Sequence, residues 1–300
     1  MPTTRIAIAQ LLGAPPADVP SERKHANNLR EFERRLEEAG TRRPDVIVTG
    51  EAINRYGFGP QEAEPDEPIG AGPFHDLAAG AARSYGCYVC YAVTGPDDAG
   101  RRRNTAVLVD RSGQTAGIYH KVHCTQGERE GGIVAGDGFP VFQTDVGPVG
   151  ILICHDMSFP ESARCLMLGG ARLLLWPSNW SGWGEHISYT VIASRAIDNA
   201  ATLAFASRGH DPNDVNWLAG THGRSAVFSP EGRVLAEMPD RRPGVLACDV
   251  DLTAERVAPH LTQGKDDVFR DVILRERRPE AYTALTRATP GGSNETPQSH

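Results

Sequence analysis

The stretch Gly147-Pro-Val-Gly-Ile-Leu-Ile-Cys-His-Asp-Met-Ser-Phe-Pro-Glu161 decides the fold. Residues 149–153 form a nearly all-apolar run, which is typical of a strand that is buried on both faces of a sheet. Pro160 and Glu161 suit the first turn of a helix, because a missing amide costs nothing there and a carboxylate complements the helix dipole. The stretch therefore predicts a strand, a sharp turn at Cys154 and a helix.

Further along the chain, the predicted helix runs to about residue 168, and Gly169-Gly170 then leads to a second apolar run at residues 173–176. This order places the thiol of Cys154 at the carboxyl end of a central strand, where ligands of open α/β sheets usually bind. A nucleophile in such a turn is exposed while its backbone is fixed, as in the nucleophile elbow of serine hydrolases. A small core residue is the alternative interpretation, since free cysteines are often buried.

Strands and helices alternate along the rest of the chain. Apolar runs predict strands, and amphipathic or alanine-rich runs predict helices. The predicted strands include residues 5–11, 45–49, 87–93, 105–110, 201–207, 225–228 and 244–250, and the predicted helices include residues 21–39, 74–85 and 186–199. About a dozen strands are too many for one small layer, so two sheets with helices outside them would satisfy the burial of their apolar faces.

No break in composition marks a domain boundary within the first 282 residues. We therefore predict a single domain over residues 1–282, followed by a tail at residues 283–300 that is flexible or packed on a partner subunit. Cys87 and Cys90 form a lone CxxC on a predicted strand, and their odd spacing points the two side chains to opposite faces. A zinc or redox function of this pair is not expected.

The composition, 40% hydrophobic and 23% charged, is that of a globular protein with a sizeable core. The net charge of −7 gives no sign of a nucleic-acid or membrane-surface partner. The chain shows neither a secretory signal nor an apolar run near the roughly 18 residues of a membrane span. Six cysteines are too few and too unevenly placed for a disulfide framework. We expect a cytoplasmic protein.

Residues 154–161, Cys-His-Asp-Met-Ser-Phe-Pro-Glu, resemble the nucleophile motif of the nitrilase superfamily, the carbon–nitrogen hydrolases. Two further motifs match in the required order, Thr49-Gly-Glu51 and Tyr119-His-Lys-Val-His123, and the resemblance covers about residues 5–255. It implies an α/β fold, a four-layer αββα sandwich of two mixed sheets with outer helices. It also implies a catalytic triad of Glu51, Lys121 and Cys154, no cofactor and no metal, and a homodimer or larger homo-oligomer.

The chemistry of these residue types fits the hydrolysis of a C–N bond. Amides are poor electrophiles, so a covalent route through a strong nucleophile such as Cys154 is faster. A free thiol has a pKa near 8.5, and a base must take its proton at neutral pH; Glu51 is the candidate. Lys121 and the backbone N–H of His155 would stabilise the oxyanion of the tetrahedral intermediate.

Members of the superfamily often carry a second glutamate, which positions the substrate. The segment Gln126-Gly-Glu-Arg-Glu-Gly-Gly132 offers two, of which Glu128 fits the spacing better and Glu130 is the alternative. We expect Asp156 to cap backbone amides of the turn rather than to take part in the chemistry. Residues 176–180, Trp-Pro-Ser-Asn-Trp, follow a predicted strand and could line the pocket.

Two positions depart from the family pattern. Gly50 stands where proline is common before the glutamate, and His155 where tyrosine or tryptophan is common after the cysteine. The Phe-Pro-Glu at residues 159–161 resembles the amidase and carbamoylase branches. We predict hydrolysis of a small linear amide or N-carbamoyl compound through a cysteine thioester, with release of ammonia or an amine. The alternatives are a true nitrilase, a catalytically silent binding protein, and a metal-dependent hydrolase using His120 and His123, although nothing nearby completes a zinc set.

Overall fold

The computed structural model describes residues 3–13, 19–58, 65–179, 185–210, 223–257 and 267–287. The chain forms two compact units, Met1–Arg256 and Val257–His300. The second unit contains the helix α6 (Phe269–Glu276) and the short 3-10 helices η3 (Pro279–Ala281) and η4 (Thr283–Thr286). The single domain predicted over residues 1–282 stays a prediction. No helix among the described residues is long and apolar enough to span a membrane.

The first sheet of the larger unit has six strands in the order β12-β1-β2-β3-β4-β5. Their bounds are β1 (Thr4–Gln10), β2 (Val46–Thr49), β3 (Tyr88–Pro96), β4 (Arg102–Val109), β5 (Thr115–His120) and β12 (Gly244–Val250). Strands β1, β2 and β3 pair in parallel, whereas β12, β4 and β5 join by antiparallel pairing. The sheet is mixed, as predicted.

The second sheet also has six strands, in the order β11-β10-β9-β8-β7-β6. Their bounds are β6 (Val141–Thr144), β7 (Gly147–Ile151), β8 (Leu173–Pro177), β9 (Thr202–Ala206), β10 (Ala226–Phe228) and β11 (Val234–Glu237). Strands β7, β8 and β9 are parallel and the outer pairs are antiparallel. The nucleophile candidate therefore follows a parallel strand, where sheets of this kind present their ligands.

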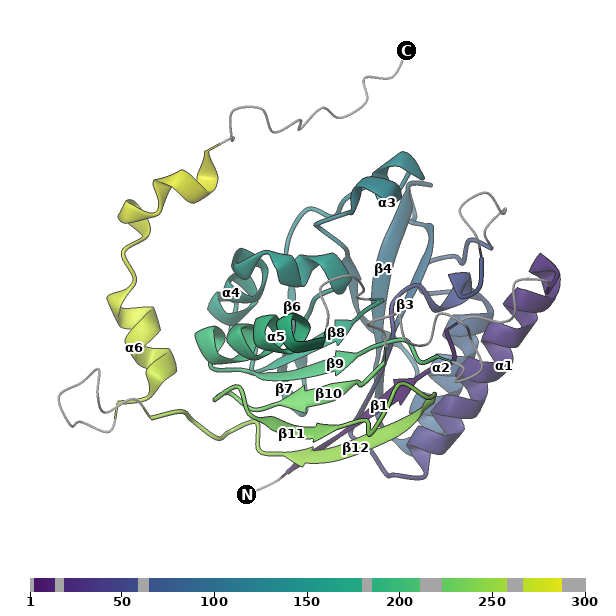
Figure 1. Cartoon of the computed structure of the whole chain (residues 1–300), viewed down its shortest axis with the longest axis horizontal. Helices are drawn as coiled ribbons and strands as arrows, with labels where there is room; N and C mark the ends of the chain where they lie inside the picture. Colours follow the sequence, from purple (N-terminus) through teal and green to yellow (C-terminus); the bar gives the residue numbers. More distant parts are fainter. Residues whose placement is uncertain are drawn as a thin grey trace, which may run out of the picture. The chain divides into compact units, whose positions relative to one another are not determined.

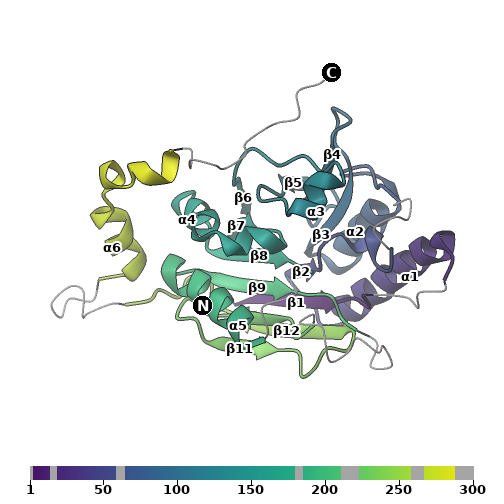
Figure 2. The ribbon, with the colours of Figure 1, turned by 45° about the horizontal axis from the view of Figure 1, so that its top comes forward.

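Four layers follow from how the strands alternate their side chains. In β1, Ala7 and Ala9 face a core shared with helices α1 (Ser21–Gly40) and α2 (Gly72–Tyr85), while Ile6 and Ile8 face a second core that contains strands of both sheets. A third core joins the other face of the second sheet to helices α4 (Pro160–Leu168) and α5 (Glu185–Asn199). Figures 1 and 2 show these helix pairs on the outer sides of the sheets. The predicted αββα sandwich is confirmed.

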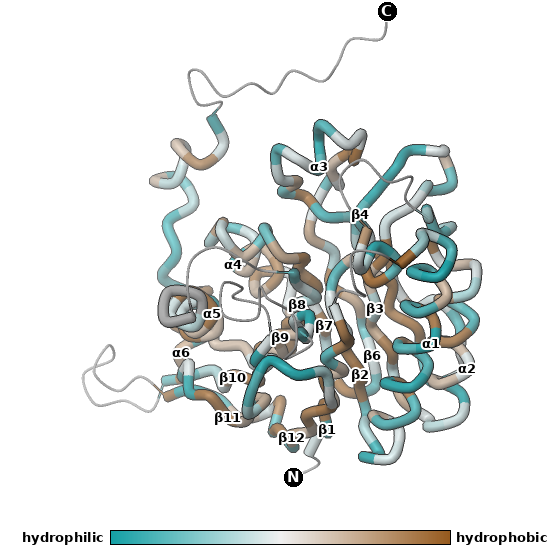
Figure 3. The backbone as a smooth tube through the Cα atoms, turned by 45° about the vertical axis from the view of Figure 1, so that its right-hand side comes forward, coloured by the Kyte–Doolittle hydropathy of each residue, from teal (hydrophilic) through white to brown (hydrophobic). Residues whose placement is uncertain are grey.

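Hydropathy along the chain follows this layering. Figure 3 shows apolar stretches along the strands and polar stretches in the connecting loops. The strand–turn–helix–strand unit is present as predicted, except that β7 ends at Ile151 and a 3-10 helix, η2 (Cys154–Ser158), fills the turn. Cys87 belongs to the core under α1 and α2, and Cys90 to the core between the sheets, so their predicted opposite orientation is confirmed.

Candidate active site

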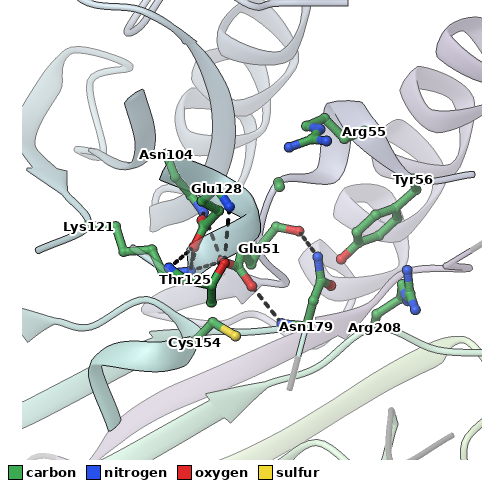
Figure 4. Close-up of a pocket in the computed structure, with 11 residues that line it drawn as sticks. Glu51, Arg55, Tyr56, Asn104, Lys121, Thr125, Glu128, Cys154, Asn179 and Arg208 are labelled. Atoms are coloured by element: carbon green, nitrogen blue, oxygen red, sulfur yellow. Dashed lines mark hydrogen bonds and ion pairs between the residues drawn. The ribbon is translucent and has the colours of Figure 1, made fainter. Parts of the chain in front are cut away.

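The ends of four strands bring polar side chains to one cavity (Figure 4). Glu51 follows β2, Lys121 follows β5, Cys154 follows β7 and Asn179 follows β8. The cavity has a volume of about 260 Å³. Its other described lining residues are Ala52, Arg55, Tyr56, Asn104, Thr125, Glu128 and Arg208. The three residues of the predicted triad therefore lie together in one small cavity.

Lys121 is held between two carboxylates. Its Nζ lies 2.7 Å from Oε1 of Glu51, and 2.9 and 2.8 Å from Oε1 and Oε2 of Glu128. Lys121 is only 2% exposed and Glu51 only 4%. Burial alone would lower the pKa of Lys121, but the acidic groups around it, Glu51 first among them, outweigh burial and hold this pKa well above its usual value. The ammonium group is therefore fixed as a cation inside the protein.

Glu128 is oriented by the start of helix α3 (Gln126–Glu130). Thr125 and Glu128 form a capping box, in which the Thr125 N–H donates to Oε2 of Glu128 at 2.8 Å. Burial acts to raise the pKa of Glu128, but Lys121 outweighs it and holds this pKa below its usual value. Glu130 is exposed and accepts a hydrogen bond from Gln126. Of the two candidate glutamates, only Glu128 contacts Lys121.

Asn104, from strand β4, binds both carboxylates with one amide group. Its Nδ2 donates to Oε1 of Glu51 at 2.8 Å and to Oε1 of Glu128 at 2.7 Å. Because both hydrogens of the amide are used, the two acids are held at fixed positions around Lys121. Asn104 is not among the predicted site residues, because its position before an apolar run carries no local signal.

Asn179 fixes the other side of Glu51. Its backbone N–H donates to Oε2 of Glu51 at 2.9 Å, and its side-chain amide donates to the Glu51 carbonyl at 2.9 Å. Asn179 belongs to the stretch 176–180 that was predicted to line the pocket, and it does line the cavity. Trp176 is instead fully buried in the core, and Trp180 lies outside the described residues.

The backbone at Cys154 is in the left-handed region, with φ of +42°. This conformation costs a residue other than glycine roughly 1–2 kcal/mol, so its surroundings must hold it. The indole Nε1 of Trp176 donates to the Cys154 carbonyl at 3.1 Å and provides one such restraint. Ala52, next to Glu51, is also left-handed, with φ of +48°. One left-handed residue is therefore Cys154 itself, and the other, Ala52, directly follows Glu51.

The pKa of the Cys154 thiol lies above its usual value, which favours the protonated form. Burial and then the negative charge of Glu51 raise its pKa, and Lys121 acts in the opposite direction more weakly. A hydrogen bond between the thiol and Glu51 contributes to the same increase. The arrangement is a neutral thiol beside a carboxylate, so the proton has an acceptor within reach.

Asp156 connects the nucleophile turn to the segment that carries Lys121. Its Oδ2 accepts from the Ile153 N–H at 2.9 Å and from the Tyr119 hydroxyl at 2.6 Å. Its Oδ1 accepts from the His123 N–H at 2.9 Å. The prediction that Asp156 caps backbone amides of the turn is confirmed, and the cap also reaches residues on both sides of Lys121.

The histidines lie around the site without converging on one point. His120 Nδ1 lies 2.8 Å from the Thr105 hydroxyl, His123 contacts Asp156, and His155 Nδ1 lies 3.1 Å from the Ser158 hydroxyl. Within the described ranges, no group of three His, Cys, Asp or Glu side chains could hold a metal ion. The backbone N–H of His155 stays a predicted oxyanion donor.

Gly50, where the family commonly has proline, lies against Tyr56. A Cβ at position 50 would lie 2.3 Å from the Tyr56 hydroxyl, and Tyr56 is only 2% exposed. We expect Gly50→Ala to destabilise the fold by about 1–3 kcal/mol through overpacking, and to displace the adjacent Glu51. Thermal unfolding and the rate of amide hydrolysis measure the two effects.

The control for this prediction removes the clashing atom. In the double variant Gly50→Ala/Tyr56→Phe, the new methyl group gains room, so most of the loss in melting temperature should be recovered relative to Tyr56→Phe alone. If the double variant melts as low as the sum of the two single effects, the contact with the Tyr56 hydroxyl is not the cause.

Comparisons with known proteins show the family to which the chain is similar. The carbon-nitrogen hydrolase family model matches residues 5–259. An omega-amidase of Xenopus laevis is 26% identical over 93% of this chain and 96% of its own length. A probable nitrilase of Schizosaccharomyces pombe is 28% identical over 70% of this chain and 74% of its own. The crystal structure of an amidase from Nesterenkonia sp. matches with a TM-score of 0.71 at 24% identity, over 94% of this chain and 96% of that one.

Proposed function

Because the chain belongs to the carbon-nitrogen hydrolase family, we propose that it hydrolyses a small linear amide or N-carbamoyl compound through a thioester on Cys154. The predicted class of enzyme, a carbon–nitrogen hydrolase, is confirmed by the family match. The observation that supports the proposed reaction most strongly is the convergence of Glu51, Lys121 and Cys154 on one cavity. An omega-amidase and an N-carbamoylputrescine amidase are among its relatives.

The first step is attack of the sulfur on the carbonyl carbon. Glu51 takes the Sγ proton as the C–S bond forms, since the protonated thiol lies beside its carboxylate. The carbonyl oxygen becomes an oxyanion. Lys121 supplies a fixed positive charge to it, and the His155 backbone N–H is the proposed second donor. One such donor is typically worth about 2.7–4 kcal/mol of the barrier.

The second step expels the amine. Protonated Glu51 gives its proton to the leaving nitrogen, the C–N bond breaks, and ammonia or an amine departs from the thioester. Glu51, again a carboxylate, then takes a proton from a water molecule that attacks the thioester. The C–S bond breaks, the sulfur regains a proton from Glu51, and the acid product leaves.

Asn104, Glu128 and Asn179 act in this proposal as positioning residues. Asn104 and Glu128 hold Lys121 and Glu51 in place through the contacts of 2.7–2.9 Å described above. The Asn179 Oδ1 is buried and has no hydrogen-bond partner among the described residues. It is available to accept a hydrogen bond from the substrate N–H₂ group, which a nitrile lacks.

The experiment that tests the reaction traps the thioester. A panel of short amides, carbamoyl amines and nitriles is screened for ammonia release, and the reaction with the best substrate is quenched in acid. Mass spectrometry is expected to find the acyl group on the peptide that contains Cys154. Prior treatment with iodoacetamide should abolish both the adduct and the ammonia. Ammonia release that persists with Cys154 fully alkylated would contradict the proposal, and a preference for nitriles would favour a nitrilase.

A homodimer or larger homo-oligomer and a cytoplasmic location complete the proposal. The assembly rests on the family resemblance, because sandwiches of this kind commonly join through the face next to the nucleophile helix, here α4. Light scattering coupled to size-exclusion chromatography tests it. A monomer at micromolar concentration would contradict it.

A further inference from the structure

The wall of the cavity beyond Glu51 carries two arginines and a tyrosine. Arg55 ends the 3-10 helix η1 (Ile53–Arg55), Tyr56 follows it, and Arg208 lies just after β9. All three line the cavity. Figure 4 shows them on one side of Glu51, with Lys121 and Cys154 on the other. Two segments far apart in the sequence therefore bring guanidinium groups into the lining of one small cavity.

Tyr56 connects this wall to the reacting groups. The guanidinium of Arg208 lies over its ring, 5.7 Å from the centroid. Burial raises the pKa of Tyr56, the charge of Arg208 lowers it and the charge of Glu51 raises it, so Arg208 and Glu51 both lie within electrostatic reach of the phenol. The Tyr56 hydroxyl is buried and has no hydrogen-bond partner among the described residues.

The described side chains that line the cavity carry both signs of charge. Glu51 and Glu128 bind the ammonium of Lys121, and Arg55 also lies within electrostatic reach of both carboxylates. Among the described lining residues, the other ionisable side chains, apart from the thiol and phenol, are Arg55 and Arg208. An amide bound at Cys154 would place its far end toward these two cations. Guanidinium groups bind carboxylates through paired hydrogen bonds and repel ammonium groups.

We propose that Arg55 and Arg208 form a subsite for a carboxylate, so that the preferred substrate is a short amide or N-carbamoyl compound with a carboxylate at its far end. This inference rests on the proposed hydrolysis at Cys154. The cavity volume of about 260 Å³ has room for a chain of a few carbons between the two groups. A compound with a terminal amine is disfavoured by the same wall.

Three five-carbon amides test the subsite, because they share the amide and the chain length and differ in the group at the far end: glutaramate ends in an anionic carboxylate, pentanamide in a neutral methyl group and 5-aminopentanamide in a cationic ammonium group. We expect kcat/KM for ammonia release to be at least about tenfold higher for glutaramate than for pentanamide, and lowest for 5-aminopentanamide, since a carboxylate forms charge-assisted hydrogen bonds with guanidinium groups. Equal values for the three compounds would overturn the subsite. Ammonia release that depends on Cys154 would leave the proposed reaction standing.

Substitutions of Arg55 and Arg208 test whether these residues cause the preference for glutaramate over pentanamide. In Arg208→Met and Arg55→Met, the ratio of kcat/KM for glutaramate over pentanamide should fall about tenfold, mainly through KM. Arg208→Lys should restore part of this ratio, which a purely structural role of Arg208 would not explain. Arg34→Met, on the exposed face of α1, removes the same charge and should leave the ratio unchanged. A ratio that survives both Met variants would overturn the assignment.

If none of the three amides is hydrolysed, a binding measurement tests the subsite instead. Calorimetry then compares glutaramate and pentanamide on the Cys154→Ala variant, with and without Arg208→Met. Selective binding of glutaramate that Arg208→Met weakens supports the subsite even though the proposed reaction has failed on these compounds. Absent or non-selective binding overturns it.

Discussion

Replacing Cys154 with alanine is expected to lower kcat for ammonia release by a factor of at least about 10⁴, because loss of a nucleophile removes the covalent route and leaves only binding and oxyanion stabilisation. The fold should remain intact. Ala52 already occupies a left-handed turn beside this site, so alanine is tolerated in that conformation, and the Trp176 indole still binds the carbonyl of residue 154. Ammonia release and the circular dichroism spectrum measure the two effects.

The matched control is Cys165→Ala. Cys165 lies on helix α4 of the same unit and is exposed, so the same atom is removed outside the cavity. This variant should keep the wild-type rate. If Cys154→Ala keeps a tenth or more of the wild-type rate and Cys165→Ala keeps less than a tenth, the assignment of the nucleophile is wrong.

Local sequence patterns predicted the elements that carry the site. The apolar run before Cys154 can be recognised from residues that are adjacent in the sequence, and so can the helix start at Pro160-Glu161. Helix α4 (Pro160–Leu168) begins and ends where expected. The end of β7 was less predictable, because residues 152 and 153 stay buried after the strand has ended and so keep the apolar composition of a strand.

The triad itself was predictable only from three motifs in a family order. Among the residues that surround it, Asn179 belongs to a stretch that was predicted to line the pocket because it follows a strand. No local pattern marks Asn104, Arg55 or Arg208, which reach the cavity through contacts between segments far apart in the chain. Their placement depends on strand order and pairing, which short stretches of sequence do not encode.

The buried cation at the centre of the site leads to a prediction about stability as well as activity. Lys121→Met removes the only ammonium group beside Glu51 and Glu128 in the described cavity and leaves two carboxylates that share the Asn104 amide. Breaking such a buried arrangement costs about 3–5 kcal/mol of the free energy of unfolding. The rate should fall by a factor of about 10²–10³ from the loss of one oxyanion donor. Chemical denaturation and ammonia release measure these losses.

The stability loss in Lys121→Met should depend on pH. In the wild-type protein, Lys121 holds the pKa of Glu128 below its usual value, so this contact contributes stability above pH about 4.5 and loses it as the pH falls further. In the variant, two adjacent carboxylates raise each other's pKa, and protonation of one relieves the repulsion. The difference in unfolding free energy between the two proteins should therefore shrink as the pH is lowered from 8 to 5.

A second substitution separates the electrostatic effect from the catalytic one. Lys121→Met/Glu128→Gln removes one of the two like charges while keeping the shape of the side chain. Much of the stability at pH 8 should return, because Glu51 then retains the donors of Asn104 and Asn179 without a second carboxylate beside it. The rate should stay as low as in Lys121→Met, since the oxyanion still lacks its cation. Recovery of the rate together with the stability would mean that Lys121 serves only to neutralise the two acids.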